Sequence, residues 1–378
     1  MEFQEEDIRE IREKVIKYFQ ELGFSINPHL KPNKSNKRFL REIHHKKRLE
    51  KLQKYRYFLE SYYPVVQEYY KGGVEINPQD IQLEIKFIDR KKNLEDYALF
   101  KWWNLVWWSI PYEKSVGRRI NYMLFDVNHN LPFGLVVLQS PVMYCKARDE
   151  YLGITKENRD YWINQSLYGQ RIGALPPYNE ILGGKMVAMS LLSTEIRKEY
   201  RRKYSNKKTS KKKRLIPPRL LFIYTLSAYG RSKIYEDLYY NSEPLSIFVG
   251  YSSGSGTFHI SDEIYRDLIT LLGNVNTSVF VSPSRKLKLV SKAFRIIGLP
   301  DFEYHNIKRG VYIFPHARNI VEVIRENSKP KWLQIKFKNL YEIWLENYVL
   351  NRVNKDRISV SWDHILRVSR YPFRVDKN

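Results

Sequence analysis

The feature that most constrains the fold of this chain is an alternation of strand-like and helix-like segments across its middle. Short apolar or alternating runs typical of strands recur there, separated by turns or by longer stretches with helical periodicity. The strand-like segments are Ile81–Ile88, Arg119–Val127, Gly134–Ser140, Ile172–Leu175, Arg219–Ser227, the stretch that begins at Ser246, and Gly310–His316. The turn NHNLP is expected to join the second and third of these segments as a hairpin, and a short helix is expected after Ser227. The alternation predicts an α/β fold in which a mixed sheet carries helices on both faces.

The two ends of the chain differ from this middle. Residues 5–22 carry apolar side chains at helical spacing, and a second helical pattern runs from Phe39 to Tyr63, where Pro64 is expected to end it. The last fifty residues are again helical and basic in pattern. We therefore expect a helical basic N-terminal region over residues 1–75, an α/β core over residues 76–327 and a helical C-terminal tail over residues 328–378.

The chain carries a large positive charge. Lys and Arg number 65 against 41 Asp and Glu, a formal net charge of +24. Such an excess attracts polyanions, nucleic acid first and an anionic membrane surface second. Residues 31–56 hold eleven Lys or Arg against two Glu, and residues 197–214 hold eleven against one. We expect DNA or another nucleic acid to bind these two blocks, and a merely solvated charged face is the alternative. The residues singled out within them are Lys46, Lys47, Arg48, Lys207, Lys208, Lys211, Lys212 and Lys213.

A Gly-Gly-Lys sequence stands where a strand pattern gives way to a helix pattern. Gly183, Gly184 and Lys185 follow an apolar pair and precede a helical pattern that continues to about Tyr204. Free N–H groups and the helix dipole favour an anion at such an N-terminus, and glycine lets the anion approach the backbone. The same two glycines also suit a tight turn with close packing. Both interpretations stay open from the sequence.

Two arginines are expected near this turn. Arg171 lies in the preceding strand and Arg231 follows the neighbouring strand, so the sequence predicts that they line one anion-binding cleft with Lys185. Separate salt bridges with Glu180 and Asp237 are the alternative.

Several kinds of chemistry lack their usual sequence patterns. Cys145 is the only cysteine, which excludes an intrachain disulfide and a cysteine-rich zinc site. The chain has no G-x-x-x-x-G-K-[ST] loop, no G-x-S-x-G elbow and no HExxH helix, so we predict no cofactor and no metal site. Asp237, Asp262 and Glu263 keep a metal-dependent nuclease as an alternative. An acidic N-terminus and the lack of a long apolar run predict a cytoplasmic protein without a membrane span.

The order of elements resembles that of the GNAT acetyltransferases. In that fold a central strand leads into a long helix, and the pyrophosphate of acetyl-CoA rests on backbone amides at the junction, within a Gln/Arg-x-x-Gly-x-Gly/Ala pattern. Here the junction is Ile181–Met186, which has two glycines but lacks the Gln or Arg, and Pro176-Pro177 removes two donors. The resemblance implies a GNAT-like mixed sheet and leaves an acyl-CoA-dependent transferase as an alternative.

Three separated blocks resemble the family of the Druantia anti-phage defence protein DruA. They are QRIGALPPYNEILGGKMVAMSLLS, LLFIYTLSAYGRSKIYEDL and FVGYSSGSGTFHIS, which begin at Gln170, Leu220 and Phe248. The similarity covers roughly residues 70–320. It implies membership of a multi-gene bacterial or archaeal defence system, with sister proteins such as a helicase as partners. A scaffold subunit of such a complex is a further alternative, and a homo-oligomer stays open.

Overall fold

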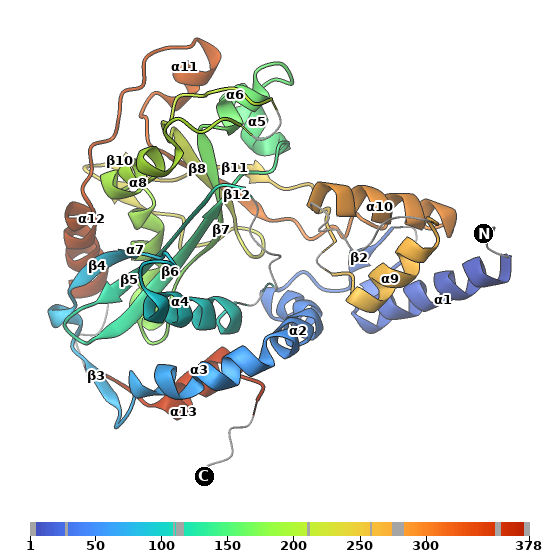
Figure 1. Ribbon diagram of the computed structural model, residues 1–378, viewed down its shortest axis with the longest axis horizontal. Coiled ribbons are helices and arrows are strands. Elements are labelled where there is room, and N and C mark those ends of the chain that lie inside the picture. Colours follow the sequence, from blue (N-terminus) through green and yellow to red (C-terminus); the bar gives the residue numbers. More distant parts are fainter. Residues whose placement is uncertain are drawn as a thin grey trace.

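A seven-stranded mixed sheet forms the centre of the molecule (Figure 1). The computed structural model describes residues 5–26, 29–108, 110, 117–209, 212–257, 259–273, 283–351 and 357–373. The strands lie in the order β11 (Ile247–Tyr251), β12 (Gly310–Pro315), β8 (Phe222–Leu226), β7 (Ser166–Ala174), β6 (Leu131–Gln139), β5 (Arg119–Asp126) and β4 (Leu83–Phe87). Neighbours are antiparallel except β7 and β8, which run parallel. The predicted α/β fold with a mixed sheet is confirmed.

The central strands are apolar along their length because both faces of the sheet are covered. Every residue of β6 and β7 is buried. The predicted hairpin is confirmed as β5 and β6, although β6 begins at Leu131 rather than at Gly134. A register shift between Leu124 and Phe125 places Pro132 opposite Phe125. Proline is tolerated beside such an irregularity because its missing N–H donor is not needed there.

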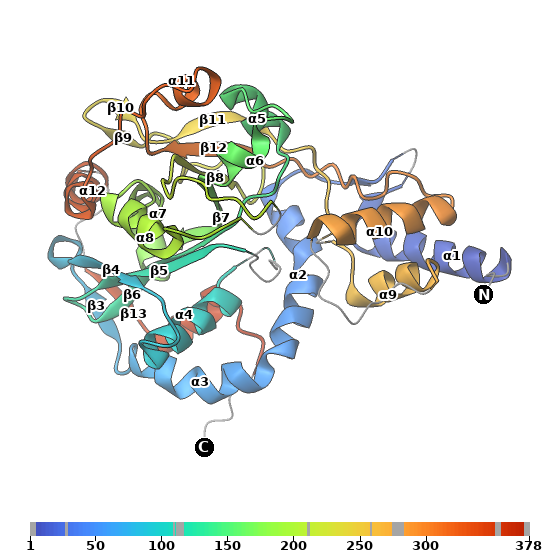
Figure 2. The ribbon, with the colours of Figure 1, turned by 45° about the horizontal axis from the view of Figure 1, so that its top comes forward.

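Helices cover both faces of the sheet, as predicted (Figure 2). One face carries α4 (Leu94–Val106), with α3 (Arg56–Glu68) and α13 (Trp362–Ser369) packed behind it. The other carries α7 (Gly183–Ser190), α8 (Thr194–Tyr204) and α12 (Phe337–Trp344). The strands β8 and β12 also contact a core that lies beneath α5 (Lys146–Leu152), α6 (Arg159–Ile163) and α11 (Ile320–Arg325). The shorter turns of helix are η1 (Pro78–Asp80), η2 (Tyr178–Ile181) and the π-helical η3 (Leu345–Leu350).

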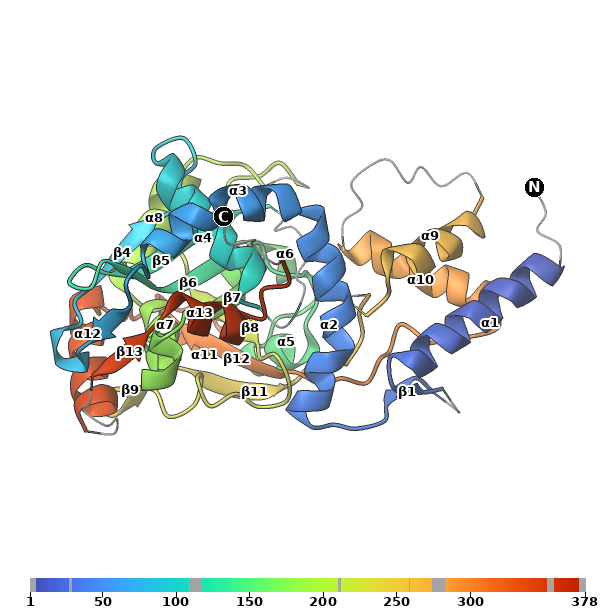
Figure 3. The same ribbon diagram turned by 90° about the horizontal axis from the view of Figure 1, so that it is seen from below.

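A helical lobe stands beside the sheet (Figures 1 and 3). It consists of α1 (Glu5–Glu21), β1 (Phe24–Ser25) and β2 (Lys31–Pro32), together with α9 (Asp262–Thr270) and α10 (Pro283–Ile296), which are inserted between β11 and β12. The lobe has a hydrophobic core of its own, in which Phe19 packs against Phe294 and Phe302. The long helix α2 (Lys37–Lys54) passes between this lobe and the sheet (Figure 3).

The packing cuts across the three segments expected from the sequence. The N-terminal helix α1 packs in the helical lobe, and β3 (Val74–Ile76) pairs with β13 (Ile358–Val360) near the C-terminus. The indole N–H of Trp362 donates to the hydroxyl of Tyr63 at 2.6 Å. The helical character of both ends is confirmed, whereas the boundaries after residues 75 and 327 stay predictions. Residues from both ends of the chain therefore pack in the same hydrophobic cores as residues from its middle.

Two predicted long helices are each divided. The predicted helix from Lys185 to Tyr204 is α7 followed by α8, because the N–H of Thr194 donates to the carbonyl of Ile335 at 2.8 Å and the helical ladder is interrupted there. The predicted helix from Phe39 to Tyr63 is divided at Tyr55, whose φ is −110°. Its second half, α3, continues through Pro64 to Glu68, so the proline does not end it.

A third predicted helix, after Ser227, is wrong. The stretch 228–240 forms turns and the short strand β9 (Tyr239–Tyr240), which pairs with β10 (Glu243–Pro244). Gly230 and Asp237 have φ of 55° and 56°, values that a right-handed helix cannot accommodate.

Candidate nucleic-acid interface

The Gly-Gly-Lys turn is closed by packing. A Cβ atom on Gly183 would lie 2.5 Å from the carbonyl oxygen of Tyr178 and 3.0 Å from the ring of Phe133. A Cβ atom on Gly184 would lie 3.0 Å from the side chain of Ile234. Every residue of α7 is buried. This geometry favours the close-packing interpretation of the two glycines and does not support the expected anion cradle.

Lys185 and Arg231 do come close together, but both stabilise one turn of the protein. The ammonium group of Lys185 donates to the carbonyl oxygens of Lys233, at 3.0 Å, and Glu236. The Nε atom of Arg231 lies 2.7 Å from the Glu236 carboxylate, which also accepts a hydrogen bond from Tyr312 at 2.8 Å. The expected salt bridges with Glu180 and Asp237 are replaced by this arrangement around Glu236.

Arg171 faces the opposite side of the sheet. Its side chain is buried, and Nη1 donates to Oδ1 of Asn104 on α4 at 2.6 Å. Since α4 and α7 cover opposite faces, Arg171 does not share a cleft with Lys185. The three-cation cleft expected from the sequence is therefore not formed.

Arg48, in the middle of the first basic block, is a buried structural residue. It is 6% exposed and donates to the carbonyl oxygens of Val106 at 2.8 Å, Ser369 at 2.6 Å and Arg370 at 3.2 Å. Burial lowers the pKa of its guanidinium group to about 10, so the group stays charged at neutral pH. These bonds join α2 to the ends of α4 and α13, and they leave Arg48 inaccessible to a phosphate.

The side chain of Lys47 also forms an intramolecular ion pair. Its ammonium group lies 2.5 Å from the carboxylate of Asp262 on α9, and Lys54 pairs with the same carboxylate. Lys46 is a residue of α2, and its side chain lies outside the described part of the structure. The centre of this block therefore links the helical lobe to the sheet, which is an outcome that the charge pattern did not predict.

The second block, residues 197–214, presents its lysines to solvent. Lys207, Lys208, Lys212 and Lys213 are exposed, and Lys211 lies outside the described residues. The loop is closed by a hydrogen bond from the N–H of Thr209 to the carbonyl of Arg214 at 2.9 Å. Within the described residues, the ion pairs of this block are Arg202 with Glu199 and Arg214 with Asp160.

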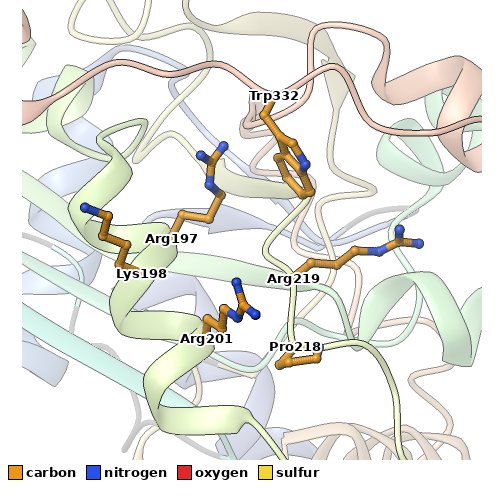
Figure 4. A pocket seen from close by; sticks show the side chains of 6 residues that line it. All are labelled: Arg197, Lys198, Arg201, Pro218, Arg219 and Trp332. Atoms are coloured by element: carbon orange, nitrogen blue, oxygen red, sulfur yellow. The ribbon is translucent and has the colours of Figure 1, made fainter.

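A pocket of about 410 Å³, called here the α8 pocket, opens beside this block (Figure 4). Arg197 and Arg201 lie one helical turn apart on α8 and so share a face. The chain that leads into β8 supplies the opposite wall, and the segment after α11 supplies an indole. The lining residues are Arg197, Lys198, Arg201, Pro218, Arg219 and Trp332.

Neutral acceptors hold two of the cations in this pocket. Arg197 donates to the carbonyl of Leu333 and to the Gln334 side chain, both at 3.0 Å, and Arg219 donates to the Gln165 side chain at 2.5 Å. Burial lowers the pKa of Arg197, but a guanidinium group stays protonated in proteins at neutral pH. No described carboxylate forms an ion pair with any of the four cationic residues of the pocket. The positive charge of this wall is therefore not cancelled locally.

The sequence located only part of this site. The basic block predicted the α8 wall, whereas Arg219 and Trp332 were not singled out as site residues. The signals available were the four-residue spacing of Arg197 and Arg201 and the position of Trp332 between lysines in KPKWLQIK. Neither signal indicates that residues so far apart in the sequence meet.

The described residues contain no group of three or more His, Cys, Asp or Glu side chains placed to hold a metal ion. Two of the carboxylates considered for a nuclease, Asp262 and Glu263, instead pair with lysines of α2 and α1. Within the same part of the chain, each helix is too short or too polar to cross a lipid bilayer.

Comparison with known proteins identifies the family. The chain is 26% identical to Druantia protein DruA of Escherichia coli (strain UMEA 4076-1) over 324 residues. This aligned region covers 83% of the present chain and 80% of the E. coli protein. No solved structure matches it. The family model of Druantia protein DruA matches residues 32–326, which adds α2 and α3 to the similarity expected from the sequence and excludes α1 and Trp332. Because this match spans well over half of its length, the chain belongs to the Druantia protein DruA family.

Proposed function

We propose that this protein is a nucleic-acid-binding component of a Druantia anti-phage defence system. The observation that carries the proposal is the α8 pocket, in which four cationic residues have no described carboxylate partner and lie beside an exposed lysine loop. Phosphodiester groups are the ligands that such a surface attracts most strongly. The net charge of +24 adds a long-range attraction of the same sign.

The proposal also includes the type of fold of the core, the partners of the protein and its place of action. The β7-α7-α8-β8 unit, in which a central strand leads into helices and the chain returns in a parallel neighbour, supports a GNAT-like description of the core. The closed packing around Gly183 and Gly184 argues against acyl-CoA at the position where that fold binds it. Membership of the Druantia protein DruA family supports sister proteins of a defence system as partners. We further propose that a helicase is among them, that the nucleic acid is DNA, and that the protein acts in the cytoplasm.

Fluorescence anisotropy with labelled single-stranded and duplex DNA over a range of salt concentrations tests the proposal. We expect binding at low salt and a steep, linear fall of log affinity with log salt concentration. The variant Lys198→Gln/Arg201→Gln is expected to bind about tenfold more weakly and to show a shallower salt dependence, since each lost phosphate contact releases fewer counterions.

A matched variant separates location from total charge. Lys71 and Lys338 are 73% and 81% exposed and lie outside the basic blocks, each beside a glutamate on its own segment. The variant Lys71→Gln/Lys338→Gln removes the same number of charges and is expected to bind almost as the unmodified protein does. Equal losses in the two variants, or no DNA binding at low salt, would contradict the proposal.

A further inference from the structure

The α8 pocket combines two kinds of wall. The guanidinium groups of Arg197 and Arg201 lie beside the space beneath the indole of Trp332, whereas the side chains of Lys198 and Arg219 extend away from it (Figure 4). Guanidinium groups bind phosphate oxygens through paired N–H donors, and an indole face stacks on a nucleobase. The two halves of a nucleotide thus each have a complementary wall.

The indole is already held in place. The guanidinium carbon of Arg197 lies 4.7 Å from the centre of the Trp332 ring, a cation–π contact. Arg197 itself is fixed by its hydrogen bonds to Leu333 and Gln334, and the Trp332 backbone forms a β-bridge with Ala317. A base that stacks on this ring does not have to order it first, and such preorganisation increases affinity.

The concave shape favours an unpaired nucleotide over a duplex. The volume of about 410 Å³ lies within the range of small-ligand sites, roughly 300–1,000 Å³. A base inside a duplex has both faces covered by its neighbours, and proteins that read a duplex insert a protruding helix or ribbon into a groove. An unpaired base can leave its stack and enter a pocket. From the pocket, α8 leads to the lysine loop, where flanking phosphates find further cations.

We propose that the α8 pocket binds one unpaired nucleotide of a single-stranded nucleic acid, with the base stacked on Trp332 and the phosphate held by Arg201. This assignment rests on the proposed function and adds the form of nucleic acid that the protein prefers. A free mononucleotide offers the same chemistry, and the experiment includes it as a separate arm.

The test compares an oligothymidylate of about fifteen nucleotides with a duplex of the same length by fluorescence anisotropy. The variant Trp332→Ala is expected to bind the single strand about tenfold more weakly while duplex binding stays within about twofold. Trp332→Phe keeps an aromatic face and is expected to recover most of the loss. Thymidine monophosphate is expected to bind more weakly than the strand, because it lacks the flanking phosphates. The reverse order would overturn the assignment to a strand.

A second measurement does not depend on the folding of a variant. Photo-crosslinking of the unmodified protein to a single strand carrying 5-iodouracil, followed by peptide mapping, is expected to give an adduct at Trp332. Adducts confined to other residues, or equal losses of single-strand and duplex binding in Trp332→Ala, would overturn the pocket assignment while leaving the proposed function intact. Failure of the unmodified protein to bind either DNA would instead remove both.

Discussion

Two segments with equal numbers of basic residues use those residues in opposite ways. Residues 31–56 and residues 197–214 each contain eleven Lys or Arg. In the first, Arg48 is buried against backbone carbonyls, and Lys47 and Lys54 share the carboxylate of Asp262. In the second, the cations line an open pocket and an exposed loop. The number of basic residues therefore predicts an attraction to polyanions but not which residues are free to contact one.

The positions of the two segments explain the difference. The helix α2 places Leu40 and Ile43 in the core of the helical lobe and Leu52 in the core beside the sheet. Of the described cations between these anchors, Lys47 meets the carboxylate of Asp262 in the lobe and Arg48 meets backbone carbonyls at the ends of α4 and α13. Only one side of α8 is packed, through Ile196 and Tyr200, and its other side carries Arg197 and Arg201 at the edge of the pocket.

The largest expected effect comes from removing the buried cation of the first segment. Arg48→Ala leaves three carbonyl groups without their donors, two of them near the C-terminal helix α13. We expect the free energy of unfolding in urea to fall by about 3 kcal/mol, since several charge-assisted hydrogen bonds are lost together. Arg41→Ala, at an exposed position of the same helix, is expected to change it by no more than about 0.5 kcal/mol.

The DNA affinity of the Arg48→Ala variant also distinguishes the two segments. Folded Arg48→Ala protein is expected to keep the affinity of the unmodified protein, because the guanidinium group does not reach the surface. A loss of affinity without a loss of stability would mean that the first segment also contacts nucleic acid, and the contrast between the segments would fail.

The sequence predicted those parts of the fold that depend on local pattern. The strand patterns gave the β5–β6 hairpin and the mixed sheet, and apolar spacing gave α1. It did not predict the partner of α1, because the contact of Phe19 with Phe294 and Phe302 joins segments separated by most of the chain. Contacts of this kind depend on the complementarity of surfaces, which no local periodicity encodes.

The candidate site shows the same limit. The 197–214 block was recognisable from composition, but the pocket also needs Trp332, which follows a different helix. Gly183 illustrates the opposite case, because a glycine pair before a helix has the same sequence whether it receives an anion or the carbonyl of Tyr178. Only the packing around the turn distinguishes the two.

Two triple variants, each lacking three exposed cations, compare the contributions of the two segments to DNA binding. Lys207→Gln/Lys208→Gln/Lys212→Gln and Lys34→Gln/Arg38→Gln/Arg41→Gln each remove three exposed cations. We expect the first variant to lower DNA affinity about tenfold and the magnitude of the salt slope by up to about 3, and the second to lower affinity by less than about threefold. Anisotropy titrations at several salt concentrations measure both quantities.

Thermal unfolding controls for stability, which neither triple variant is expected to change by more than about 0.5 kcal/mol, since exposed cations contribute little. Equal losses of affinity would show that total charge, rather than the position of the second segment, determines binding.

The smallest expected effect concerns the ion pairs that join α2 to α9. Burial raises the pKa of the Asp262 carboxyl, but hydrogen bonds from Lys47 and Lys54 and their charges outweigh it, so the pKa lies well below its usual value. A carboxyl with a depressed folded-state pKa stabilises the fold above its unfolded value near 4, and this contribution is lost as the pH falls through the folded pKa.

Asp262→Asn should therefore lower the free energy of unfolding at pH 7 by about 1 kcal/mol or less, because the carboxylate is 42% exposed and screened by solvent. The difference from the unmodified protein should shrink as the pH falls below 4 and also in 1 M salt. Exposed Glu346→Gln serves as the control and should change stability little at either pH. A difference that persists unchanged at pH 2 would show that Asp262 acts through packing rather than charge. Since Lys47 would then need no anionic partner, the reason for assigning it to the lobe junction rather than to nucleic acid would be lost.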